Sequence, residues 1–158
     1  MGIALSRHPR SKYLVATKMS NQAARGREES LAMYRKSLEL LKVDYFDYYL
    51  VHSVGKLDDY KERYLDNGIL DFMLEEREKG RIRNLGWSFH GEREFFDYMM
   101  SNGVKWDFVQ IQANYFDWKT ALGRSNVDAR YLYDVLEKRR IPALLEHVVE
   151  VAGVDDVL

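Results

Sequence analysis

The stretch Phe46-Asp47-Tyr48-Tyr49-Leu50-Val51-His52 is a strand-length run of apolar and aromatic residues that stops at a histidine. Four further runs of this kind occur along the chain, and longer segments with helical periodicity separate them. These runs are Tyr13–Thr17, Ile82–Trp87, Phe108–Gln112 and Ile141–Leu145. Because the connections between successive runs are far too long for hairpins, the five strands are expected to form a parallel sheet.

The segments between the strands have the pattern of amphipathic helices. In the first of them, Leu31, Tyr34, Leu38 and Leu41 fall on one stripe at helical spacing. The expected helices span Glu28–Leu41, Asp66–Lys79, Glu92–Ser101 and Asp128–Arg139. This alternation of strands and helices predicts an α/β fold with both faces of a parallel sheet covered.

Two architectures would cover both faces, a (β/α)8 barrel and a doubly wound sandwich. Lys18, His52 and Ser88 each stand at the carboxyl end of a predicted strand. Titratable or polar groups at the carboxyl ends of successive strands are typical of a barrel active site. The G-x-G-x-x-G turn of dinucleotide-binding sandwiches is absent from the sequence. The pattern therefore favours the barrel, of which five strands would form a part.

Composition excludes several classes of function. The 158 residues carry a net charge of -1, which gives no bulk electrostatic reason to expect nucleic acid or an anionic membrane as a partner. The sequence holds no apolar run of the roughly 20 residues that a bilayer span needs. The chain has no cysteine, which excludes disulfides, thiolate catalysis and iron–sulfur ligation by its own residues. A cytoplasmic location is expected, and no metal site is predicted.

Read in order, the strand-end segments resemble the third to sixth strands of the aldo-keto reductase family. The resemblance covers about residues 1–146 and is nearest to the prokaryotic branch whose full-length members often carry a C-terminal ferredoxin-like domain. The segments that carry it are Val15-Ala16-Thr17-Lys18, Val43–His52, Gly80–His90 and Asp107–Gln112. It implies a partial (β/α)8 TIM barrel with family strands three to seven, and NADPH-dependent reduction of an aldehyde or ketone.

The resemblance also assigns roles to four residues. Lys18 matches the lysine that lowers the pKa of a proton-donating tyrosine, and His52 matches the histidine that orients the carbonyl. Ser88 and Gln110 match the positions that bind the nicotinamide carboxamide of NADP. Each has a structural alternative: Lys18 could extend into solvent, and Ser88 could cap the following helix. His52 could be a hydrogen-bonded histidine of the rim, and Gln110 could pair with a neighbouring residue instead of a ligand.

Other polar and aromatic residues near these strand ends are open to two interpretations. His90 is interpreted as the start of the following helix rather than as a catalyst. Asn114 could line the same rim. The aromatic residues Tyr115, Phe116 and Trp118 could line a substrate pocket or pack at the base of a long loop.

Two parts of the family pattern are not found. The proton-donating tyrosine and its paired aspartate belong to barrel sequence that precedes the strand of Lys18. At the other end residues 147–158 diverge from the family, and the eighth strand and the phosphate-binding segment for the cofactor are not found. A truncated or frameshifted reading frame would explain both ends, and the chain is expected to be inactive alone. As an alternative, the half-barrel would be a non-catalytic interaction module that pairs with itself or a complementary piece through its open sheet edges.

Overall fold

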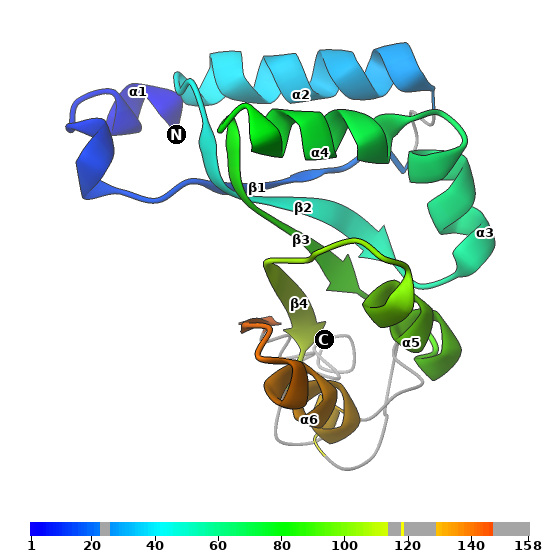
Figure 1. Cartoon of the computed structure of the whole chain (residues 1–158). Helices are drawn as coiled ribbons and strands as arrows, with labels where there is room; N and C mark the ends of the chain where they lie inside the picture. The colour runs from blue at the N-terminus through cyan, green and yellow to red at the C-terminus, as the bar shows by residue number, and fades with distance from the viewer. Residues whose placement is uncertain (23–25, 114–117, 119–128, 147–158) are drawn as a thin grey trace, which may run out of the picture.

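The structure, a computed structural model, describes residues 1–22, 26–113, 118 and 129–146. It contains one five-stranded sheet with the strand order β1-β2-β3-β4-β5, and all neighbouring strands are parallel (Figure 1). The strands are β1 Ala16–Met19, β2 Phe46–Val54, β3 Ile82–Phe89, β4 Phe108–Gln112 and β5 Ala143–Glu146. The prediction of five parallel strands is confirmed.

The four long helices follow the predicted segments. They are α2 Arg27–Leu41, α4 Ile69–Glu78, α5 Arg93–Ser101 and α6 Ala129–Arg139. Helix α4 begins at Ile69 rather than at Asp66, because Gly68 has a left-handed conformation with φ +66° that a helix interior does not allow. Asp128, where the last of these helices was expected to begin, lies outside the described residues.

Four short helical segments occur besides these; the first two lie in residues 1–12, where the sequence indicates the end of a helix and a turn, and the last two were not predicted. They are α1 Gly2–Leu5, the 3₁₀ turn η1 Arg10–Lys12, α3 Leu57–Tyr60 and the π-helical η2 Lys61–Leu65. In the last two, Tyr60 and Tyr64 are buried and stand four residues apart, which is the spacing of one helix face. Most of the residues around these two tyrosines are charged, so the apolar spacing is too short to indicate a helix from the sequence.

The helices pack on one face of the sheet. Every second residue along the strands points to this face, as Tyr49, Trp87 and Val109 do. These residues are buried in a single apolar core with residues from α2, α4, α5 and α6. The ring of Tyr34 on α2 meets Tyr49 edge-on at 5.4 Å, and the rings of Trp87 and Phe96 on α5 lie 5.5 Å apart.

Residues of the other parity point to the inner face. Lys18, Leu50, Gly86 and Phe108 form one row across β1 to β4. Leu50 and Phe108 are buried but stand apart from the helix-covered core. Helices on the outer face alone are the arrangement of a barrel wall, whereas a doubly wound sandwich carries helices on both faces. The barrel interpretation therefore holds for this part of the chain.

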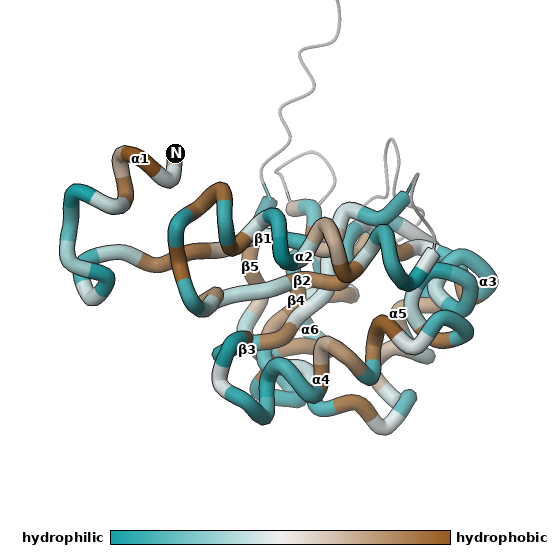
Figure 2. The backbone as a smooth tube through the Cα atoms, turned by 90° about the horizontal axis from the view of Figure 1, so that it is seen from above, coloured by the Kyte–Doolittle hydropathy of each residue, from teal (hydrophilic) through white to brown (hydrophobic). Residues whose placement is uncertain are grey.

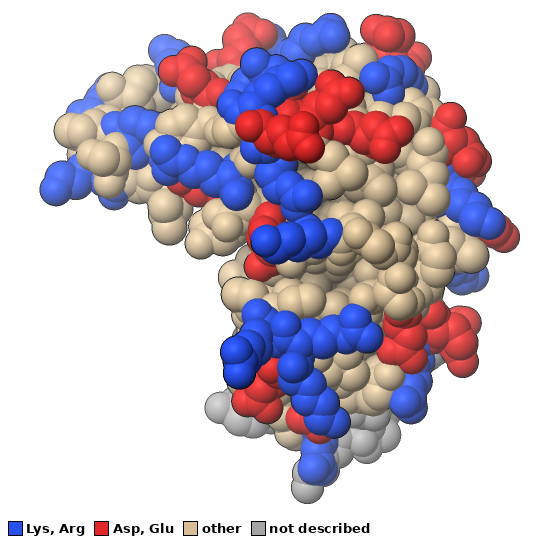
Figure 3. All heavy atoms as spheres, in the orientation of Figure 1, with Lys and Arg blue, Asp and Glu red and all other residues tan. Residues whose placement is uncertain are grey.

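The surface is polar on the side where the helices face solvent. Figure 2 shows brown and teal alternating along α2 and α4, as expected for helices with one packed side, and shows α1 standing away from the sheet. Lys and Arg are interspersed with Asp and Glu on the face drawn in Figure 3, in keeping with the net charge of -1. Among the described residues, no helix has the length and apolar character that crossing a bilayer requires.

Candidate active site at the carboxyl edge of the sheet

The structure brings the four predicted site residues onto one face. Lys18 pairs in register with Leu50, which stands two residues before His52 on β2, and Ser88 pairs with Gln110. Paired residues of parallel strands point to the same side, and side chains alternate along each strand. Lys18, His52, Ser88 and Gln110 consequently lie on the inner face, toward the carboxyl ends of four adjacent strands.

His52 is half-buried and is held by a serine hydroxyl. Its Nδ1 lies 2.9 Å from Oγ of Ser20, which follows β1 directly. Burial, together with the positive charges of Lys18 and Arg63, lowers the pKa of His52 from 6.5 to about 4, and nearby Glu146 opposes this only in part. The imidazole is therefore neutral at physiological pH and can donate a hydrogen bond from one nitrogen while accepting at the other.

Lys18 lies on the edge strand β1 and is partly buried. Its charge acts on His52, which places the two side chains in the same electrostatic environment. Within the part of the chain that the structure describes, Lys18 has no carboxylate at ion-pair distance. The aspartate that the family pairs with this lysine is thus not supplied by the described residues.

Ser88 and Gln110 lie side by side on β3 and β4. Ser88 is fully buried, and its Oγ accepts a hydrogen bond from the Ser53 N–H at 2.7 Å. It does not cap the following helix, since α5 begins at Arg93 after Glu92 and has no side-chain cap. Gln110 donates from Nε2 to Oε2 of Glu146 on β5 at 2.8 Å, so its amide oxygen remains an acceptor on the inner face.

Strand β2 does not end at His52, as the sequence pattern had suggested. The strand continues to Val54, but the pairing with β3 shifts between Val51 and Val54, which marks a bulge at His52 and Ser53. Ser53 has φ +51°, a left-handed conformation that is uncommon for any residue with a Cβ. Bulges of this kind redirect side chains and occur often beside active sites.

Sequence reasoning missed several residues of this edge. Glu146 ends β5 and joins two of the neighbours, because its Oε2 also lies 3.8 Å from Nε2 of His90. His90, interpreted as the start of a helix, instead lies at the rim directly after β3. Its alternation with Ser88 along the chain was the available signal, since both residues share one face of an extended segment.

The loops after β2 and β3 touch at two glycines. A Cβ added to Gly91 would lie 2.2 Å from the Cα of Gly55, and one added to Gly55 would lie 2.1 Å from the carbonyl oxygen of His90. Only glycine permits this close approach. The contact fixes the rim between His52 and His90.

The loop after β4 contributes little that can be placed. Asn114, Tyr115 and Phe116 lie outside the described residues. The ring of Trp118 lies 5.8 Å from that of Tyr133 on α6, which agrees with a packing role for this tryptophan.

Comparison with known proteins identifies the family of this chain. A model of the Aldo/keto reductase family matches residues 1–146, a range that contains all five strands. The chain belongs to the aldo/keto reductase family. Among aldo/keto reductases of known sequence, it is 38% identical to a glyoxal reductase of Bacillus subtilis (strain 168) over 89 residues, which are 56% of this chain and 29% of that protein.

Two solved structures share the fold of this chain. An aldo-keto reductase from a Medee basin deep-sea metagenome library gives a TM-score of 0.66 at 23% identity, over 92% of this chain and 48% of that one. A mutant of Gox0644 in complex with NADPH gives 0.65 at 24% identity, over 90% and 46%. The chain thus spans about half the length of the solved relatives that it matches.

Proposed function

We propose that this chain carries the lysine, the histidine and the carboxamide-binding residues of an NADP-dependent aldo/keto reductase that reduces an aldehyde or ketone. The observation that carries the proposal is the placement of Lys18, His52, Ser88 and Gln110 on one face at the carboxyl ends of four adjacent strands. The carboxyl edge of the strands is where barrel enzymes hold their substrates. The family membership and the NADPH complex of a structural relative support the choice of cofactor.

The donor set at this edge fits a nicotinamide carboxamide. A carboxamide presents an acceptor oxygen and N–H donors. Gln110 offers an amide oxygen, because its Nε2 is bound to Glu146. Ser88 retains its hydroxyl hydrogen, because its oxygen accepts from Ser53. Gln110 is half-buried and Ser88 is fully buried, so Gln110 is the more accessible of the two to a ligand.

The chain's own residues would orient the carbonyl and prepare a proton donor. When bound, NADPH supplies the hydride. With the Ser20 hydroxyl donating to Nδ1 of His52, Nε2 would carry the proton that is donated to the carbonyl oxygen. Lys18 would favour the ionised form of a tyrosine placed beside it and so ease proton transfer to the oxygen.

We place the proton-donating tyrosine outside this chain. Tyr48 is the tyrosine of the described strands that shares the inner face with Lys18. It pairs with Ala16, however, and therefore lies nearer the amino ends of the strands than Lys18, which pairs with Leu50. Its ring packs edge-to-face against that of Phe108, with the ring centroids 5.3 Å apart. Without a donor, general acid catalysis worth roughly 10²–10⁴-fold is lost, and the chain alone is expected to be inactive.

The test measures cofactor binding and turnover separately. NADPH fluorescence titrations should show binding to the purified chain, weakened about tenfold in Gln110→Ala through loss of one hydrogen bond. NADPH absorbance with glyoxal as probe should show no turnover. An NADPH affinity that is unchanged in Gln110→Ala would refute the assignment of Gln110 to the carboxamide. Turnover that Lys18→Ala or Tyr48→Phe abolishes, while the exposed-lysine control Lys36→Ala retains it, would refute the claim that the donor lies elsewhere.

A second candidate is association of the half-barrel through its edges. Among the described strands β1 and β5 each have one neighbour, and Leu144 and Leu145 on β5 are 46% and 54% exposed. Open strand edges with apolar side chains invite pairing, here with a second copy of the chain. Sedimentation velocity tests this: a discrete dimer would support the module, and a compact monomer would contradict it.

The setting we propose is cytoplasmic, with a small carbonyl compound as partner and neither nucleic acid nor membrane. Support comes from the near-neutral net charge of -1 and from the absence of cysteine in the sequence. Cofractionation of the tagged protein with membranes or nucleoids in cell lysates would contradict it.

A further inference from the structure

The backbone at His52 and Ser53 leaves the regular sheet ladder, yet all four of its polar groups are bonded by side chains. The His52 N–H donates to the Tyr64 hydroxyl at 3.0 Å, and the Ser53 N–H donates to Ser88 Oγ at 2.7 Å. The carbonyl oxygens of His52 and Ser53 both accept from the guanidinium of Arg63, at 2.7 and 3.2 Å. Side chains thus replace the ladder partners that the bulge removes.

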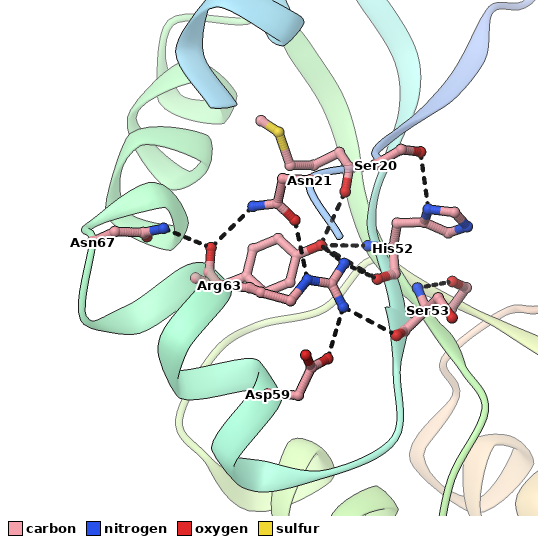
Figure 4. A network of polar contacts seen from close by, with 10 residues as sticks. Ser20, Asn21, His52, Ser53, Asp59, Arg63 and Asn67 are labelled. Atoms are coloured by element: carbon pink, nitrogen blue, oxygen red, sulfur yellow. Dashed lines mark hydrogen bonds and ion pairs between the residues drawn. The ribbon is translucent and has the colours of Figure 1, made fainter. Parts of the chain in front are cut away.

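Arg63 reaches this backbone from η2, where it is almost completely buried (Figure 4). Its Nη1 also donates to Asp59 Oδ2 at 2.7 Å, and its Nε donates to Asn21 Oδ1 at 3.2 Å. The buried charge is therefore paired and its planar donors are occupied on several sides. A side chain held in this way has one orientation, and the two carbonyls that it binds are fixed with it.

Tyr64 extends the same contact to β1. Its hydroxyl donates to the carbonyl oxygen of Met19 at 2.9 Å and lies 3.0 Å from Nη2 of Arg63. Met19 follows Lys18 directly, and His52 N–H is bonded to the same hydroxyl. One buried pair on η2 therefore links the backbone next to Lys18 with the backbone of His52.

We infer that Arg63 is a positioning residue of the reductase site, which holds the strained bulge of β2 so that the His52 imidazole faces the substrate position beside Lys18. The inference rests on the proposed role of His52. It assigns no contact with substrate or cofactor to Arg63. It explains why Ser53, with its Cβ, remains at φ +51°. The guanidinium of Arg63 and the hydroxyls of Ser88 and Tyr64 bind the surrounding backbone and together fix the conformation.

Three variants separate positioning from charge and from general stability. Arg63→Gln removes both the charge and the planar guanidinium. Arg63→Lys keeps the charge but cannot bind two carbonyls in the same plane. Tyr64→Phe deletes a single hydroxyl and serves if the arginine variants do not fold. Arg77→Gln is the matched control, because Arg77 also donates to a backbone carbonyl, that of Lys105 at 2.6 Å, away from this edge.

The readout is the His52 ring in NMR spectra of the cofactor-free chain, recorded as ¹⁵N shifts and as a pH titration. The charged groups that act on this ring are Lys18 on β1, Arg63 on η2, His90 after β3 and Glu146 on β5. All of them except Arg63 are unchanged in the variants.

Positioning predicts that both arginine variants displace the His52 ring resonances and raise its titration midpoint from about 4 toward 6.5, with a smaller displacement in Tyr64→Phe. Arg77→Gln should leave them in place. Recovery of the wild-type resonances in Arg63→Lys would overturn the inference, because charge alone would then suffice. So would lowered stability with an unchanged His52 ring. An NADPH affinity that Gln110→Ala does not change would instead count against the proposed function and leave this spectroscopic result standing.

Discussion

The buried carboxylate of Asp47 offers the sharpest test of how the sheet is held together at the edge opposite the site. Asp47 is 2% exposed, and its carboxylate accepts hydrogen bonds from Arg10, from Arg83 at 3.1 Å and from the Val15 N–H at 2.8 Å. Arg10 precedes β1 and Arg83 lies on β3, so one carboxylate joins three neighbouring segments. Asp47→Asn keeps the shape and removes the charge.

The expected loss is about 3 kcal/mol of unfolding free energy. Removing one partner of a buried ion pair typically costs roughly 3–5 kcal/mol. The lower end applies because the Arg10 and Arg83 side chains are 23% and 54% exposed and can recover part of their hydration. The hydrogen bond from Val15 adds nothing to the loss, since the asparagine oxygen still accepts it.

The loss should depend on pH. Burial alone would raise the pKa of Asp47, but the hydrogen bonds from Arg10 and Val15 and the charges of both arginines outweigh it and lower the pKa below 3.8. A carboxyl whose folded pKa is depressed stabilises the fold above its unfolded pKa, and this stability is lost as the pH falls through the folded value. The difference between wild type and Asp47→Asn should therefore be full at neutral pH and shrink below about 3.8.

Urea unfolding followed by circular dichroism measures this difference at neutral and acidic pH. Asp44→Asn is the control. Asp44 lies just before β2 and is exposed, and its substitution removes the same charge as Asp47→Asn. A loss below about 1 kcal/mol at neutral pH would show that the three contacts are no better than a surface pair. An undiminished difference at low pH would show that the loss does not come from the charge.

Three further measurements test the site and the core. NMR titration should give His52 a midpoint near 4; since this lies below the unfolded value of 6.5, stability should fall as the pH drops from 6.5 toward 4, and a midpoint near 6.5 would contradict the burial of the ring. Gly91→Ala forces the loop away from Gly55 and should cost about 2 kcal/mol in urea unfolding, with wild-type stability as the contrary result. Tyr34→Phe removes the hydroxyl that donates to the buried carboxylate of Glu76 at 3.1 Å and should cost about 2 kcal/mol by thermal unfolding, whereas no change in melting temperature would show that Arg81 and Lys79 satisfy Glu76 without it.

The sheet and the shared face of the site residues could be predicted because they depend on local patterns. Strand alternation fixes which residues share a face, and polar residues at strand ends mark the edge. The bounds Phe108–Gln112 were predicted as they stand in the structure. The one-sided helix packing follows from the same alternation once Tyr49 and Trp87 are assigned to the outer face.

The support of the site could not be predicted, because it comes from contacts between distant parts of the chain. Nothing in the residues around Arg63 indicates that its guanidinium binds the carbonyls of His52 and Ser53. The left-handed Ser53 likewise carries no local signal, since such positions usually have glycine or asparagine. A short helical segment rich in charged residues is typically solvent-exposed, and only the tertiary structure shows that η2 is buried at Arg63 and Tyr64.

The position of each site residue within the sheet determines how firmly it is held. Ser88 and Gln110 stand on β3 and β4, which have paired strands on both sides, while Lys18 stands on β1, whose pairing partner among the described strands is β2 alone. His52 lies at the bulge of β2, where the side chains of Tyr64 and Arg63 hold its backbone instead. On that edge the Tyr64 hydroxyl at Met19 O adds a bond from the helical side. A strand that pairs with the free side of β1, from another part of a longer protein or from another chain, would therefore change the setting of Lys18 more than that of the other three. Such a strand would give β1 a second paired neighbour and so restrict the backbone that carries Lys18.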